Sequence, residues 1–139
     1  MTASREYYRQ EPVLTIVGGA DWDYQITIER VASTTIEGRI TDIIRLGPFD
    51  LTGYTEFVGQ LRSFDGLQSV SAQITLDGTG DEGTIRVRGT GRDSWALQEA
   101  GLRAGRLTIR AKAPSGGRFR IVPARWNLEV GSTSPLAGV

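Results

Sequence analysis

The chain has 139 residues, of which 39% are hydrophobic and 23% charged, a composition typical of one folded domain. Sixteen basic residues balance sixteen acidic ones, so the formal net charge is zero and no overall field would attract nucleic acid or an anionic membrane surface. The absence of cysteine and histidine excludes disulfides, thiol nucleophiles, histidine-dependent triads and the usual zinc sites. We therefore expect a protein that is not an enzyme and that holds no cofactor or metal.

The chain has no run that approaches the roughly 20 apolar residues needed to span a bilayer. Its first ten residues, MTASREYYRQ, are too polar to form the apolar core of a signal peptide. We expect a chain that is made in a cytoplasm and is not exported by the usual route.

The first half of the chain predicts short strands separated by turns. Residues 1–12 form a polar arm that carries Tyr7 and Tyr8 and that we expect to be flexible. A strand is expected at 13–17, then a glycine-rich turn, then a strand at 22–28, where apolar and polar residues alternate. A hairpin is expected within 30–48.

The second half has a clearer strand pattern. After an extended segment at 56–62 and a turn at 63–67, alternation predicts strands around 70–76, 84–88 and 107–111. One or two helical turns are expected at 95–100, with Asp93 or Ser94 as the N-cap and Gly101 as the end. Phe119 and Ile121 mark a return strand that should stop at Pro123, and a last strand is expected around 126–130.

These patterns predict an all-β fold: an antiparallel β-sandwich, Ig-like or a partly open barrel, with about seven or eight strands and one short helix. The domain should cover 13–131. The tail, 132–139, has no periodicity and is expected to be loose.

Two acidic features have the residue types of functional sites. Asp77, Thr79 and Asp81 could offer oxygens to calcium, but Asp and Gly are also typical of any exposed hairpin loop, which is the interpretation we favour. The same loop matches a dinucleotide fingerprint by spacing, yet an alternating strand follows it where a helix is required. Asp21 and Asp23 are a pair of acidic side chains, as glycosidases use. We favour the interpretation that they are surface charges exposed to solvent.

The tryptophans and arginines are candidates for contacts with a partner. Trp22 and Trp126 are in phase with inward residues, so we expect them in the core, whereas Trp95 near the helix start should be partly exposed. Several arginines of the C-terminal segments fall at outward or turn positions and could form a basic face for an acidic partner. They are Arg86, Arg88, Arg106, Arg110, Arg118, Arg120 and Arg125.

Short motifs resemble a known family. Ile16–Trp22 (IVGGADW), the Asp50–Tyr54 turn (DLTGY) and the Gln60–Arg62 strand end (QLR) resemble the N-terminal domain of the bacteriophage baseplate upper protein family and related tail adaptors. Leu102–Gly105 and the strand around 126–130 follow the family's closing hairpin and last strand. The physical meaning of Asp-Leu-Thr-Gly is a turn, because Asp and Thr cap backbone amides and glycine adopts positive φ.

The resemblance implies a structural protein of a virion, a tail or baseplate adaptor present in several copies. Its partners would be other virion proteins and copies of itself, without nucleic acid, membrane or a small-molecule substrate, and the arm would order on assembly. The contact residues we expect are Tyr7, Tyr8, Trp95, Arg118 and Arg120. A capsid-decorating cement protein and, less favoured, a carbohydrate-binding module that uses exposed tryptophans are the alternatives.

Overall fold

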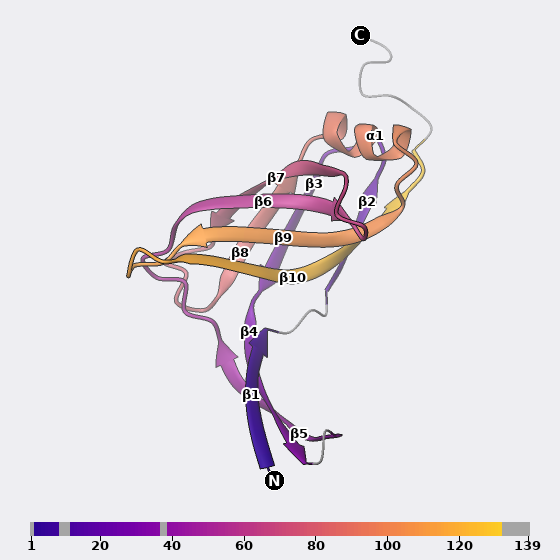
Figure 1. The fold of residues 1–139 in the computed structure, drawn as a ribbon. Coiled ribbons are helices and arrows are strands. Elements are labelled where there is room, and N and C mark those ends of the chain that lie inside the picture. Colours follow the sequence, from indigo (N-terminus) through magenta and orange to yellow (C-terminus); the bar gives the residue numbers. More distant parts are fainter. Residues whose placement is uncertain (1, 9–11, 37–38, 132–139) are drawn as a thin grey trace.

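The computed structural model describes residues 2–8, 12–36 and 39–131 and contains two β-sheets and one helix (Figure 1). The elements, in chain order, are β1 (Thr2–Tyr8), β2 (Val13–Val17), β3 (Trp22–Thr27), β4 (Glu29–Ile36), β5 (Arg39–Pro48), β6 (Thr55–Ser63), β7 (Ser69–Leu76), β8 (Thr84–Gly89), α1 (Gly91–Glu99), β9 (Ala104–Lys112) and β10 (Arg118–Glu129). The described residues thus form ten strands, where about seven or eight were expected.

The body of the molecule is a seven-stranded sheet with the strand order β2-β10-β9-β6-β7-β8-β3. Its pairs are antiparallel except for β2, which runs parallel to β10. The two edge strands, β2 and β3, are joined by the turn at 18–21, and the Tyr24 hydroxyl on β3 donates to the Thr15 carbonyl on β2. The sheet therefore curls almost onto itself, and the expected fold class, a β-sandwich or partly open barrel with one short helix, is confirmed.

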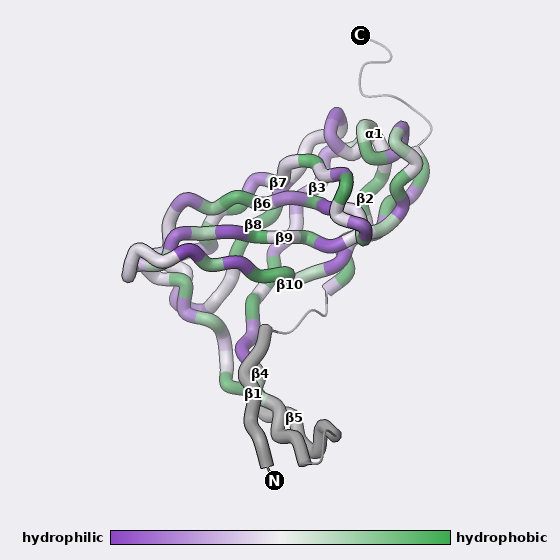
Figure 2. Tube along the Cα trace, in the orientation of Figure 1, coloured by the Kyte–Doolittle hydropathy of each residue, from purple (hydrophilic) through white to green (hydrophobic). Residues whose placement is uncertain are grey.

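The interior of the curled sheet is the hydrophobic core. Alternate residues of body strands such as β2 and β8 face inward, which gives alternating colours along the tube in Figure 2. Trp126 is 1% exposed and donates its indole N–H to the Arg62 carbonyl over 3.1 Å, and Trp22 is 7% exposed. Both tryptophans are core residues, as their phase in the sequence predicted.

A second, three-stranded sheet of order β1-β4-β5 projects from the body (Figure 1). The β4–β5 hairpin confirms the one expected within 30–48, and β1 pairs antiparallel with β4, from Thr2 opposite Ile36 to Tyr8 opposite Arg30. The N-terminal arm expected at 1–12 thus contains a strand that the sequence pattern did not predict, and its flexibility stays a prediction. The tail, 132–139, lies outside the described residues.

The helix begins earlier than its sequence indicated. Thr90 is the N-cap, because its side chain accepts from the Asp93 N–H over 3.2 Å, so Asp93 and Ser94 are not caps. Ser94 is fully buried instead; its hydroxyl accepts from the Gly19 N–H and donates to the Ala20 carbonyl, each over 3.0 Å. The prediction was wrong because Ser94 has the chemistry of a cap but uses it to dock α1 on the β2–β3 turn.

Pro123 does not end a strand. β10 continues from Arg118 to Glu129, and its register with β9 shifts between Ile121 and Ala124. A β-bulge places a residue outside the regular ladder, where the missing proline N–H costs no hydrogen bond. The two strands expected on either side of Pro123 are therefore one bent strand.

The Asp50-Leu-Thr-Gly segment forms the expected turn. The Asp50 carboxylate accepts from the Thr52 N–H over 2.9 Å, and Gly53 has φ +82°. Hydrogen bonds from Thr52 hold the pKa of Asp50 below its ordinary value of 3.8, because they stabilise the charged form. The role of this motif is therefore structural.

Candidate functional site

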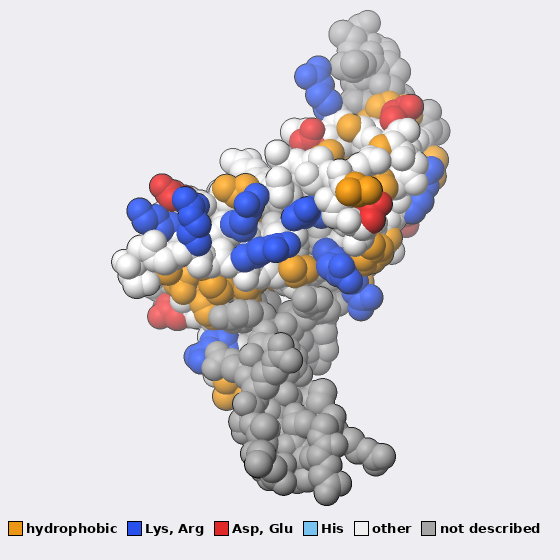
Figure 3. Space-filling model, in the orientation of Figure 1, with side chains coloured by type: hydrophobic (Ala, Val, Ile, Leu, Met, Phe, Trp, Pro, Cys, Tyr) orange, Lys and Arg blue, Asp and Glu red, His pale blue; other side chains and the backbone are white. Residues whose placement is uncertain are grey.

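The most distinctive surface is the outer face of β6, β9 and β10. Many outward positions on these adjoining strands carry cations, and Figure 3 shows lysine and arginine side chains as a run of blue across the molecule, with acidic side chains only toward its ends. We call this surface the basic face; its residues are Arg62, Arg106, Arg110, Lys112, Arg118, Arg120 and Arg125.

The strand register sets like charges opposite one another on this face. Arg118 pairs with Lys112, and Arg120 pairs with Arg110. Arg106 on the central strand β9 lies between Arg125 on β10 and Arg62 on β6. Directly opposed like charges destabilise a sheet, typically by about 0.2–1 kcal/mol per pair. The opposed cations therefore lower the stability of the folded chain, so stability does not explain their arrangement.

Within the described part of the chain, no carboxylate lies within 4.0 Å of any basic-face cation. Two of the cations have neutral contacts: the Arg62 guanidinium donates to the Gly66 carbonyl over 3.0 Å, and that of Arg106 lies 5.1 Å from the centre of the Phe64 ring. These contacts hold Arg62 and Arg106 in place without neutralising their charge, so the face is positioned to attract anionic groups.

Two shallow hollows lie on the basic face and share Arg120. One, of about 300 Å³, is lined by Glu56, Val58, Arg110, Lys112, Arg118 and Arg120, among others. The other, of about 450 Å³, is lined by Arg62, Phe64, Asp65, Arg106, Thr108 and Arg120, among others. Each hollow combines several cations with a single acidic residue, a lining that suits carboxylate or phosphate groups better than an apolar ligand.

A turn at 63–68 borders the second hollow and presents Phe64, which is 51% exposed. The Asp65 carboxylate accepts from the Ser63 hydroxyl and from the Leu67 N–H, the latter over 2.9 Å. These hydrogen bonds hold the pKa of Asp65 below its ordinary value of 3.8. Asp65 is thus occupied in shaping the turn.

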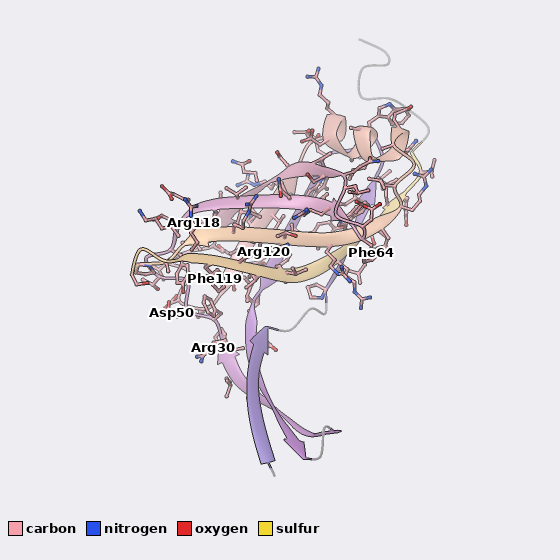
Figure 4. All side chains as sticks on the ribbon, in the orientation of Figure 1. Arg30, Asp50, Phe64, Arg118, Phe119 and Arg120 are labelled. Carbon is pink, nitrogen blue, oxygen red and sulfur yellow. The ribbon has the colours of Figure 1, made fainter. Side chains whose placement is uncertain are left out.

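Figure 4 labels two of the residues predicted as contacts, Arg118 and Arg120. Arg118 and Arg120 lie together on the basic face, on β10. Trp95 is half-buried on α1, and Tyr7 and Tyr8 lie on β1 in the other sheet, so the structure does not gather the predicted residues into one site. Their roles as contacts stay predictions.

Sequence reasoning grouped the arginines only in part correctly. Arg86 and Arg88 lie on β8, separated from β9 by β6 and β7, and Arg86 forms an ion pair with Asp23 over 3.2 Å. The sequence-based group also lacked Arg62 and Lys112, which belong to the basic face. Their outward phase in 56–62 and 107–112 was a usable signal, but the pairing of β6 with β9 was not visible in the sequence.

Two other candidate sites, an exposed tryptophan row for sugar and a calcium site in the 77–83 loop, receive little support. Trp22 and Trp126 are buried and Trp95 is half-buried, so the three do not form an exposed row for sugar. In the 77–83 loop, Asp77 accepts from the Gln25 amide and Asp81 accepts from the Thr79 hydroxyl over 2.8 Å. Among the described residues, no group of three acidic side chains is arranged to hold a metal.

The carboxylates considered for a glycosidase share a hollow of about 540 Å³ with Asp93, but both are exposed rather than directed inward. Asp21 accepts from the Gly91 N–H over 2.6 Å at the start of α1, and Asp23 is the ion-pair partner of Arg86. Both side chains thus have structural partners, and the arrangement expected of paired catalytic acids is not present in them.

No protein-family model and no curated protein matches the chain. Among solved structures, murine CRIg is similar over 92% of this chain and 99% of its own, at 11% sequence identity and with a TM-score of 0.35. A likeness of this degree carries no argument about function. In the described residues, no helix is long and apolar enough to cross a membrane.

Proposed function

We propose that this chain is a non-catalytic structural subunit of a bacteriophage virion, an adaptor of the tail or baseplate that is assembled in several copies. The observation that carries the proposal is the basic face, a patterned surface of like charges on a chain whose net charge is zero. Such a surface suits a specific acidic neighbour better than a diffuse polyanion, because the whole chain has no long-range attraction for anions.

The projecting sheet gives the protein a second means of joining neighbours. Its order is β1-β4-β5, so β1 and β5 are edge strands with one side each that pairs with no described strand. An edge strand has main-chain donors and acceptors that can pair with a strand of another chain. Tyr7 and Tyr8, predicted as contacts, lie on the edge strand β1, which is consistent with a role in assembly.

The resemblance of Ile16–Trp22 and Asp50–Tyr54 to phage tail adaptors supplies the virion setting, and the chemistry of the chain supports a role without catalysis. The sequence has no histidine and no cysteine, the side chains that most often transfer protons or act as nucleophiles near neutral pH. Partners are then other virion proteins and copies of this chain, and the site of action is the virion.

A cryo-electron-microscopy reconstruction of the particle that contains this chain tests the proposal. We expect density for it at the tail or baseplate, with the basic face against a carboxylate-rich surface of a neighbour. Density spread over the capsid lattice would make it a cement protein instead. Absence of the chain from any particle would overturn the proposal.

A further inference from the structure

The chain carries an acidic surface that complements its basic face. Two loops, 49–54 and 77–83, contain four carboxylates and no lysine or arginine. The loops lie side by side, because the Leu51 N–H donates to the Gly80 carbonyl over 2.9 Å. We call these carboxylates the acidic loop pair; they are Asp50, Asp77, Asp81 and Glu82.

All four carboxylates are exposed, and none lies within 4.0 Å of a cation in the described part of the chain. Three have neutral donors: the Thr52 N–H for Asp50, the Gln25 amide for Asp77 and the Thr79 hydroxyl for Asp81. Neutral donors fix the carboxylates but leave their negative charge available to a neighbour.

The two charged surfaces lie on different sides of β10, because Phe49 and Tyr54 of loop 49–54 pack on Phe119, whose side chain alternates with the outward Arg118 and Arg120. The basic face consists of strand residues of β6, β9 and β10, whereas the acidic loop pair consists of connections at strand ends. Figure 4 shows Asp50 beside the sheet that carries Arg118 and Arg120, and not on its face. One copy can therefore use its loops on one neighbour and its face on another, which is a head-to-tail contact that builds rings or filaments.

We propose that the acidic loop pair of one copy docks on the basic face of the next copy. The inference rests on the proposed function only in that the protein acts in several copies. Docking would bring carboxylates to the opposed pairs Arg118–Lys112 and Arg110–Arg120, where the isolated chain has like charges only. A second copy fits better than nucleic acid, because the net charge of the chain is zero and gives no long-range attraction for a polyanion.

The test is sedimentation velocity of the full chain at low salt, at rising concentration, with paired charge reversals. We expect the wild-type chain to form oligomers that high salt dissociates, because exposed charge pairs are screened. R118E/R120E alone and D81K/E82K alone should each be monomeric. Their equimolar mixture should associate again, because the unchanged loops of one variant meet the unchanged face of the other, and the two reversed surfaces also carry opposite charges.

The matched control is R88E/R92E, which makes the same change in charge as R118E/R120E at exposed positions outside the basic face. It should associate like the wild-type chain. Circular dichroism melts of all variants show whether each is folded, and the mixture provides a gain of association that a misfolded variant could not produce.

Three outcomes would overturn the inference: a wild-type chain that stays monomeric up to about 1 mM, association that ignores both reversals, or a mixture of the two variants that stays monomeric. If the inference fails, a labelled oligonucleotide and a poly-glutamate peptide are added to the monomeric chain. Binding of either one to the basic face would identify nucleic acid or an acidic protein as the occupant instead of a second copy. A tail location without charge-dependent self-association would defeat this inference alone, and self-association of a chain absent from particles would defeat only the proposed function.

Discussion

Gly105 on β9 lies where a backbone carbonyl of β6 and the Trp126 indole of β10 both approach closely. A Cβ at this position would stand 1.9 Å from the Arg62 carbonyl oxygen and 2.7 Å from the Trp126 indole nitrogen. Those two atoms form the hydrogen bond that satisfies the buried indole. Only glycine therefore lets β9 pass between β6 and Trp126, and the same carbonyl belongs to a residue of the basic face.

Asp65 gives a prediction at the scale of one residue. Its folded-state pKa is below the ordinary 3.8, chiefly because the Ser63 hydroxyl and the Leu67 N–H donate to the carboxylate. A lowered pKa adds stability that is fully present above the unfolded value and is lost as pH falls through the folded one. We therefore expect the turn at 63–68 to loosen only below pH 3.8.

The measurement is an NMR titration of the Asp65 carboxyl carbon in the folded protein, with the amide signal of Leu67 as a second reporter. Both should titrate together, with a midpoint below 3.8. The Asp65→Asn variant should remove the acid-dependent shift of the Leu67 amide. A midpoint at or above the ordinary value would show that the turn does not stabilise the carboxylate.

At the scale of an element, α1 is held by its first residues. Thr90 caps the helix, and the buried Ser94 joins it to the β2–β3 turn through the Gly19 N–H and the Ala20 carbonyl. The helix is 9 residues long, too short to be stable by itself in water, so these contacts and the burial of Leu97 must hold it.

We expect Thr90→Ala to lower the free energy of unfolding by about 1 kcal/mol, because the N–H of Asp93 loses its acceptor. Chemical denaturation monitored by tryptophan fluorescence measures the change. Asp93→Ala should cost less, since the Asp93 side chain acts only through its charge in the first turn, an effect of about 0.3–1 kcal/mol. A larger cost for Asp93→Ala would place the cap at Asp93.

At the scale of the whole molecule, the structure consists of a curled body and a projecting sheet. The core residues that lie deepest, such as Ile16, Leu61 and Leu107, belong to strands of the body. β1 pairs only with β4, according to the register of the described residues. The body should therefore keep its stability when β1 is absent.

Deletion of residues 1–8 tests this division. The β4–β5 hairpin would be left two-stranded, and such hairpins are at most marginally stable in water. Hydrogen exchange should show lost protection for amides of 29–48 and unchanged protection for amides of β9 and β10. Ile16→Ala is the contrasting control, because loss of a fully buried side chain should cost about 2–5 kcal/mol and lower protection throughout the body. Protection lost across the body after the deletion would contradict the division.

The sequence by itself determined the local structure and much of the burial. Alternation at 22–28 and 70–76 predicted strands and their inward side chains, and Asp65-Gly66 and Gly101 predicted a turn and a helix end. These features are local, because a period of two and a positive φ depend on neighbouring residues only. Pro123 shows the limit of such reasoning: whether proline breaks a strand or occupies a bulge depends on the partner strand.

Tertiary structure alone decided which strands are neighbours, and with that the candidate site. β6 pairs with β9, and β2 with β10, across long stretches of chain that contain other strands. The pattern of one strand fixes which side chains point outward but not which outward side chains stand side by side. For that reason the sequence predicted Arg118 and Arg120 as exposed cations, whereas only the fold joined them to Arg62 and Lys112 and separated them from Arg86 and Arg88.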